Sequence, residues 1–219
     1  MMTAEPEIST ALRKHYGTTL AKHGPNAAGT DWRLEENAEI AYVKMMAVLL
    51  DRHKGARPSL LDVGCGYGGL LSHAKRVGIA LDYSGIDIVP EMVAHGRSFH
   101  PEATFFVGDA QTFEFPRRYD YIVCNGVLSL KLKTSILDMN IYAARLIRRI
   151  FSIAHTGIAF NVMTNRVNFM VDHAYYRSPV EILAFCLSEL SNKCRIDHAY
   201  NRFEFTTYVY RDEAITGSE

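Results

Sequence analysis

The chain has 219 residues, 48% of them hydrophobic, and its 24 Lys and Arg residues balance its 24 Asp and Glu residues. This hydrophobic content excludes a chain that is disordered throughout, and we expect residues 1–219 to form one domain with a full-sized core. The formal net charge of zero provides no surplus of positive charge for binding nucleic acid.

Cysteine use and the N-terminal sequence indicate the compartment. The four cysteines form no C-x-x-C pair, which is typical of a reduced cytoplasmic protein. The first residues are polar and acidic, so we expect no signal peptide. No apolar run approaches the roughly 18 residues that a membrane span requires. We therefore expect a cytoplasmic protein with no membrane partner.

Residues 1–34 form a polar leader whose apolar residues show only weak helical spacing. We expect Gly17 and the glycines after it to break this leader into loops that can close over a site. The next predicted element is a helix, with Asp31 as its N-cap and its end near His53.

The rest of the chain is organised around residues 60–71, whose sequence is LLDVGCGYGGLL. The first apolar run predicts a short buried strand, and the residues after Gly68 resume helical spacing. The glycines between the two runs allow the main chain to turn sharply and to approach a ligand closely. Such a loop lies at the carboxyl end of a strand, where open α/β sheets bind nucleotides.

Strands and helices alternate after this loop. A helix is predicted to begin at Pro90, and another covers residues 135–155. The further strands are predicted at residues 83–88, 103–107, 119–124, 157–162, 195–200 and 203–210. The last two of these form a hairpin. This alternation indicates an α/β fold with a mostly parallel sheet and helices on both faces.

The glycine loop is compatible with two kinds of nucleotide site. Gly64, Gly66 and Gly69 satisfy the G-x-G-x-x-G pattern of a dinucleotide-binding oxidoreductase. Asp87 lies about 20 residues further on, which also fits that pattern. Asp62 favours a different ligand, because its carboxylate would repel a pyrophosphate and would attract an ammonium or a sulfonium group. S-Adenosylmethionine carries both of these cations, and an NAD-dependent oxidoreductase remains the alternative.

The string Asp-Val-Gly-Cys-Gly-Tyr-Gly at residues 62–68 resembles motif I of the class I S-adenosylmethionine-dependent methyltransferases, in particular the small bacterial ones. The resemblance covers roughly residues 35–211 in layout, with its specific motifs within about residues 60–130. It implies a Rossmann-like sheet of seven strands, with a parallel core, a C-terminal antiparallel hairpin and helices on both faces. It also implies an enzyme that transfers a methyl group from S-adenosylmethionine.

The resemblance places the cofactor at the ends of the predicted strands. Asp87 would accept hydrogen bonds from the ribose hydroxyls, and Asp109 would accept one from the adenine amino group. Asn125 takes the place of the acid that several methyltransferase groups carry nearby, so no catalytic carboxylate is expected there. A backbone carbonyl is expected near the ammonium of the methionine part instead. The predicted cofactor residues are Asp62, Gly64, Cys65, Gly66, Asp87, Ile88, Asp109, Ala110, Asn125 and Trp32.

Loops outside the alternating strands and helices are expected to bind the methyl acceptor. These loops are the leader and an insertion at residues 164–179. The core that contains the insertion spans residues 35–211, and we expect a flexible tail at residues 212–219. A hydroxyl acceptor would need a general base, for which histidine is the natural candidate. The predicted catalytic residues in these loops are His23, His173, Tyr175 and Tyr176.

The size and charge of the chain favour a small-molecule acceptor that is methylated at oxygen or nitrogen. Methylation of a protein or an RNA is the alternative, and we expect a monomer or a homodimer. No H-E-x-x-H motif is present, and no metal site is expected.

Overall fold

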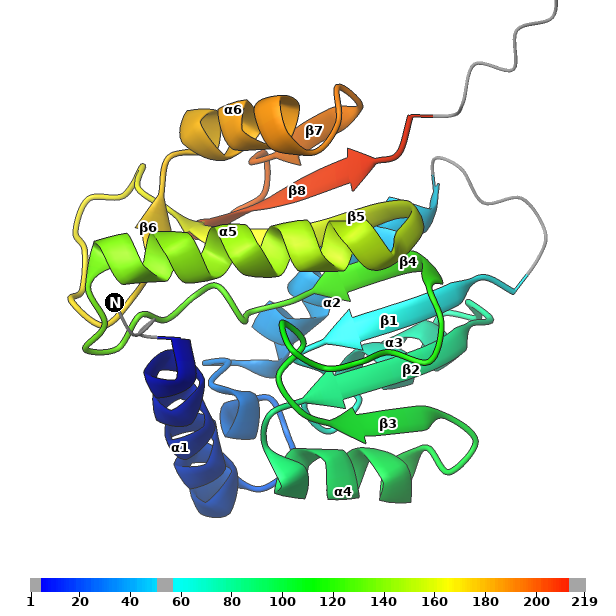
Figure 1. The fold of residues 1–219 in the computed structure, drawn as a ribbon. Helices are drawn as coiled ribbons and strands as arrows, with labels where there is room; N and C mark the ends of the chain where they lie inside the picture. The colour runs from blue at the N-terminus through cyan, green and yellow to red at the C-terminus, as the bar shows by residue number, and fades with distance from the viewer. Residues whose placement is uncertain (1–4, 51–56, 213–219) are drawn as a thin grey trace, which may run out of the picture.

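The computed structural model describes residues 5–50 and 57–212, and its strands form one sheet (Figure 1). The main path of the sheet has the order β3-β2-β1-β4-β5-β8-β7. The strands are β1 (Ser59–Val63), β2 (Asp82–Asp87), β3 (Thr104–Val107), β4 (Tyr119–Cys124), β5 (Ala154–Thr164), β7 (Cys194–Asp197) and β8 (Glu204–Tyr210). The first five run parallel, and β8 is antiparallel to both β5 and β7. The predicted seven-stranded plan is confirmed.

An eighth short strand, β6 (Tyr176–Arg177), pairs with the end of β5 off this main path. It comes from the insertion that the sequence assigned to a loop. Two residues are too few to show an alternation of polar and apolar side chains in the sequence. Only the pairing with Met163 and Thr164 in the folded chain defines this strand.

Helices cover both faces of the sheet, as predicted. On one face lie α2 (Glu35–Leu50), α3 (Gly69–Arg76) and α4 (Pro90–Phe99), and on the other lie α5 (Ile136–Ile153) and α6 (Pro179–Glu189) (Figure 1). The two hydrophobic cores follow from the alternation of side chains along a strand. In β1, Leu60 packs in the core beneath α2 and α3, and its neighbour Leu61 packs in the core beneath α5.

The leader forms a continuous helix, α1 (Glu5–His23), so the predicted break at Gly17 is wrong. Glycine in a helix interior costs about 1 kcal/mol relative to alanine. Ile8, Leu12 and Leu20 on this helix are buried, and burying each apolar side chain stabilises it by roughly 1.5 kcal/mol or more. Tertiary packing therefore outweighs the local preference, and α1 lies beside the carboxyl ends of the parallel strands (Figure 1).

The helix predicted from Asp31 begins later than expected. Asp31 follows a short 3-10 turn (Ala28–Thr30) and has a left-handed conformation with φ of 67°, so it does not cap α2. Glu35 and Glu36 occupy the first turn of α2, where acidic side chains suit the helix dipole. The predicted end near His53 lies outside the described residues. Within the described ranges, no helix combines the length and hydrophobicity needed to cross a bilayer.

Candidate active site

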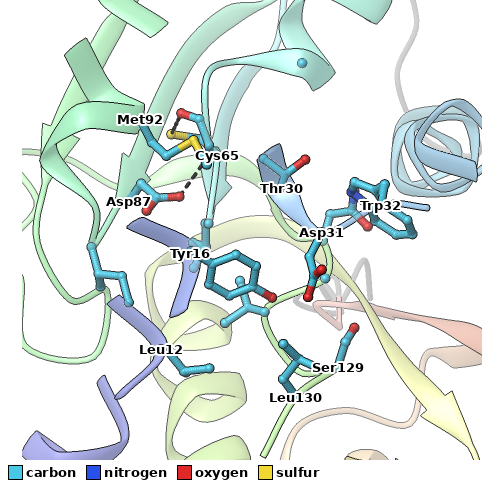
Figure 2. A pocket seen from close by; sticks show the side chains of 18 of the residues that line it. Leu12, Tyr16, Thr30, Asp31, Trp32, Cys65, Asp87, Met92, Ser129 and Leu130 are labelled. Carbon is cyan, nitrogen blue, oxygen red and sulfur yellow. Dashed lines mark hydrogen bonds between the residues drawn. The ribbon is translucent and has the colours of Figure 1, made fainter. Parts of the chain in front are cut away.

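A cavity of about 750 Å³ opens at the carboxyl ends of the parallel strands, where the loops after β1, β2, β3 and β4 converge. Leu12 and Tyr16 of α1 contribute one wall of it. Figure 2 shows Tyr16 reaching into the cavity between Asp87 and Asp31. Burial and the charges of these two carboxylates raise the pKa of Tyr16, so its phenol stays protonated and can donate a hydrogen bond.

The structure gathers most of the predicted site residues around this cavity. Its lining includes every predicted cofactor residue: Asp62, Gly64, Cys65, Gly66, Asp87, Ile88, Asp109, Ala110, Asn125 and Trp32. Of the predicted catalytic residues, His23, His173 and Tyr176 also line it.

Tyr175 lies elsewhere. Its side chain is buried, and its hydroxyl donates to Oδ1 of Asn140 on α5 at 2.8 Å. Consecutive residues of an extended segment point in opposite directions, so Tyr176 faces the cavity while Tyr175 faces the core. In this structure Tyr175 is a packing residue.

The glycine loop forms the floor of the cavity through its main chain. Gly64 and Gly66 have φ values of 75° and 53°, which residues other than glycine rarely adopt. A Cβ atom on Gly64 would also lie 2.2 Å from Cγ2 of Val127. The backbone nitrogens of Gly64 and Cys65 donate to the carbonyl of Ile86 at 2.9 and 3.1 Å, which ties the loop to β2.

Asp87 ends β2 with a fixed carboxylate. Its Oδ2 accepts a hydrogen bond from the backbone of Gly66 and its Oδ1 accepts one from the backbone of Val89, both at 2.9 Å. Each oxygen retains a further lone pair that can accept from a ligand. Burial raises the pKa of Asp87, and the two backbone hydrogen bonds oppose that rise. This arrangement suits a ligand that presents two hydroxyl groups.

Asp62 is the second carboxyl group beside the glycine loop, and it is buried, with only 2% of it exposed. Burial raises its pKa to about 7, the hydroxyl of Tyr83 that donates to Oδ2 at 2.8 Å lowers it, and the charge of Asp87 raises it again. The charge that acts on Asp62 is therefore another negative one. A cationic ligand would stabilise both carboxylates, whereas a pyrophosphate would be repelled.

Asp109, after β3, is held from two sides. The hydroxyl of Ser9 on α1 donates to Oδ2, and the backbone nitrogen of Gln111 donates to Oδ1 at 2.9 Å. The hydrogen bond from Ser9 links the leader helix to the strand end that it covers. Nothing in the sequence pairs these two residues, which are 100 positions apart.

A polar chain on the other side of the cavity joins β4, β5 and β8. Oδ1 of Asn161 accepts a hydrogen bond from the backbone nitrogen of Gly126 at 2.7 Å. Its Nδ2 donates one to Oδ1 of Asn125 at 3.0 Å. The same Nδ2 donates to Oε2 of Glu204 at 2.9 Å. Glu204 lines the cavity and is only 3% exposed.

The prediction from sequence missed Glu204. The available signal was a single acidic residue between two phenylalanines at the start of the last predicted strand. Among residues 5–50 and 57–212, no cluster of histidine, cysteine and acidic side chains could hold a metal ion.

Comparisons with known proteins agree with this geometry. A family model described as a methyltransferase domain matches residues 60–148. The Mycobacterium tuberculosis protein Rv1506c, named as a methyltransferase, is 31% identical over 155 residues, which cover 69% of this chain and 92% of that protein.

A dTDP-3-amino-3,6-dideoxy-alpha-D-glucopyranose N,N-dimethyltransferase of Streptomyces fradiae is 35% identical over 80 residues, or 36% of this chain and 30% of that enzyme. Among solved structures, magnesium protoporphyrin IX methyltransferase of Synechocystis PCC 6803, with S-adenosylhomocysteine bound, has a TM-score of 0.70. The match covers 93% of this chain and 99% of that one at 17% identity, so it shows a common fold.

Proposed function

The chain belongs to the class I S-adenosylmethionine-dependent methyltransferases, and from that membership we propose that it methylates a nitrogen or oxygen of a small-molecule acceptor. The observation that carries this proposal is the pair of carboxylates beside the glycine loop, of which Asp62 is buried and Asp87 is half-buried. Among the described residues, no cationic side chain acts on either carboxylate, so the pair fits a ligand with an ammonium and a sulfonium. The pair does not fit the pyrophosphate of NAD.

In this proposal, residues at the ends of different strands bind different parts of the cofactor. Asp62 binds the ammonium group, and Asp87 accepts from the ribose hydroxyls. Asp109 and the backbone of Ala110 hold the adenine, and Asn125 faces the methionine part. Five further residues complete the wall: Gly64, Cys65, Gly66, Ile88 and Trp32.

When bound, S-adenosylmethionine supplies a methyl group on an already activated sulfonium. The protein must then align the acceptor, exclude water and accept a proton. The wall formed by α1 supports the exclusion of water, because Leu12 and Tyr16 cover the strand ends. His23, His173 and Tyr176 lie where an acceptor would enter, and we assign them to its binding.

A small-molecule acceptor is supported by the shape of the site and by the relatives. The cavity of about 750 Å³ is lined on several sides by α1 and by residues of the 164–179 insertion. The names of the two characterised relatives describe methylation of an amino sugar nucleotide and of a magnesium porphyrin. We further propose a cytoplasmic monomer or homodimer that acts without nucleic acid, which the four free thiols and the zero net charge support.

Incubation with methyl-labelled S-adenosylmethionine and a cell extract tests this function. After separation by size, label is expected in the small-molecule fraction. Label found only in protein or RNA would contradict a small-molecule acceptor. An absence of transfer to any fraction would contradict methyltransferase activity.

The affinity for S-adenosylmethionine is expected to rise with pH up to about pH 7 and to level off above it. Asp62 must be ionised to attract the ammonium, and its pKa of about 7 exceeds the ordinary value. Below that pKa the affinity should fall by up to about tenfold per pH unit. Calorimetric titrations at several pH values measure this, with Asp62→Asn as the control that loses the dependence. A wild-type affinity that does not change between about pH 5.5 and pH 7 would contradict the role of Asp62.

Tyr175 and Tyr176 provide a matched pair of hydroxyl deletions. Tyr176→Phe is expected to slow transfer to the methyl-accepting extract fraction several-fold at low acceptor concentration, with unchanged cofactor affinity. Tyr175→Phe should leave transfer unchanged and lower the free energy of unfolding by about 1 kcal/mol, because Asn140 loses a partly buried hydrogen bond. Initial rates and urea denaturation distinguish the two effects, and the reverse pattern would exclude Tyr176 from the acceptor site.

A further inference from the structure

Glu204 is a buried carboxyl group that has no role in the cofactor binding proposed above. It is the first residue of β8, opposite Met163 of β5, and both side chains line the cavity. Asn161 donates to Oε2 at 2.9 Å, whereas Oε1 is buried and has no hydrogen-bond partner among the described residues. A buried oxygen without a partner costs free energy that a ligand could recover by donating to it.

Arg202 and Asn161 favour the ionised form of Glu204. Burial raises its pKa to about 6, and the charge of Arg202 and the hydrogen bond from Asn161 oppose that rise. The guanidinium of Arg202 lies over the ring of Trp32, 5.8 Å from its centroid. A second titratable neighbour is Tyr200, whose hydroxyl is paired with Thr206. At neutral pH the group is therefore largely a carboxylate with one free oxygen.

Part of the cavity lining is apolar and exposed. Phe169 and Val171 of the insertion and Phe203 of the last loop line the cavity, and all three are exposed to solvent. The rings of Phe169 and Phe203 meet edge to face with centroids 6.4 Å apart. A ligand that reaches Glu204 past these side chains would bury an apolar body against them.

We propose that Glu204 binds the acceptor and takes its proton, and that the acceptor is an amine attached to an apolar body. This inference rests on the proposed function and names the substrate class for the same site. The ammonium of the acceptor donates to Oε1 of Glu204 and passes one proton to it. The nitrogen lone pair then forms the new bond to the methyl carbon as the carbon–sulfur bond breaks, and its electron pair remains on sulfur. The methylated product leaves as an ammonium after Glu204 returns its proton to solvent.

The low polarity of the site favours an amine over a hydroxyl. Transfer of a proton from an ammonium to a carboxylate converts two buried charges into two neutral groups. Transfer from a hydroxyl to the same carboxylate only moves a negative charge from one buried oxygen to another. A carboxylate in this position therefore assists an amine acceptor more than an alcohol.

Two probes of the same shape test the inference directly. Phenethylamine and phenethyl alcohol have the same apolar body and differ in the polar group. Each is titrated calorimetrically into protein saturated with S-adenosylhomocysteine. The wild type is expected to bind the amine at least tenfold more tightly than the alcohol. Glu204→Gln should reduce amine affinity at least tenfold and leave affinity for the alcohol and for S-adenosylhomocysteine unchanged.

The glutamine variant can keep the fold, because its amide oxygen can still accept from Asn161. Unchanged affinity for S-adenosylhomocysteine checks this in the same experiment. Glu114→Gln is the matched control, since Glu114 is exposed in the loop before β4 and does not line the cavity. Amine affinity of the wild type should also fall below about pH 6 as Glu204 becomes protonated, and Glu204→Gln should not show that fall. A purely structural role for Glu204 would not produce this difference.

The outcomes separate this inference from the proposed function. Equal affinity of the wild type for the two probes, no binding of the amine, or equal amine affinity in Glu204→Gln would overturn the inference and leave the methyltransferase assignment intact. A wild-type protein that does not bind S-adenosylhomocysteine would contradict the proposed function, and the inference with it.

Discussion

Replacing Asp87 by alanine is expected to weaken the binding of S-adenosylhomocysteine by roughly a hundredfold, or about 2 to 3 kcal/mol. The variant loses the charge-assisted hydrogen bonds that the carboxylate would accept from the ribose. It also leaves the backbone nitrogens of Gly66 and Val89 without their acceptor, so the glycine loop loses one of its links to β2. Calorimetric titration of the purified variant measures the affinity.

Asp82→Ala is the matched control for this change. Asp82 begins the same strand at its opposite end, where it is paired with Arg117 at the surface. Its removal should leave the affinity for S-adenosylhomocysteine unchanged. Equal affinities for wild type and Asp87→Ala would exclude Asp87 as a cofactor ligand, and an equal loss in both variants would indicate a general effect on folding.

Replacing Gly64 by alanine is expected to lower the free energy of unfolding by about 2 to 4 kcal/mol. Roughly 1 kcal/mol of this arises from the positive φ angle, which alanine adopts poorly. The remainder, about 1 to 3 kcal/mol, arises from overpacking, because the new methyl group would lie 2.2 Å from Cγ2 of Val127. Val127 follows the end of β4, so relief of this contact would move the wall of the cavity.

Gly78→Ala separates the two causes. Gly78 has nearly the same φ angle, 76°, but no atom of the described residues lies within 4 Å of its potential Cβ. It should therefore show only the conformational cost, about 1 kcal/mol. Urea denaturation of both variants measures the difference. Equal losses would mean that the contact with Val127 does not contribute.

The central part of the fold could be predicted from the sequence because its signals are local and strong. Residues 119–124 were predicted as a strand and form β4 with the same bounds. Pro90 begins α4 as expected, because its fixed φ suits the first helical turn. Each of these elements is also buried in the sheet or against it, so local preference and tertiary packing agree.

The ends of the chain were harder to predict because packing overrides local preference there. Gly17 suggested a break in α1, yet burial of apolar residues along one side of the helix keeps it continuous. The helix α6 was not predicted, although Ser178 and Pro179 are typical of a helix start. Its buried side chains, Ile182 and Cys186, are too few to show a clear period in the sequence.

The residues predicted to bind the cofactor all line the cavity, because they follow strand ends within one motif-rich region. The rest of the lining was harder to predict, because its residues come together only in the folded chain. Glu204 lies 43 positions from Asn161, its hydrogen-bond donor, and no spacing rule connects them. Tyr175 and Tyr176 were equivalent in sequence, and only the direction of the extended chain distinguishes them.

Calorimetric titration of the wild-type protein with S-adenosylmethionine, and separately with NAD, tests most directly what the cavity binds. The carboxylates of Asp62 and Asp87 predict binding of S-adenosylmethionine, with one molecule per chain, and no measurable binding of NAD. Binding of NAD without binding of S-adenosylmethionine would contradict the assignment of this site.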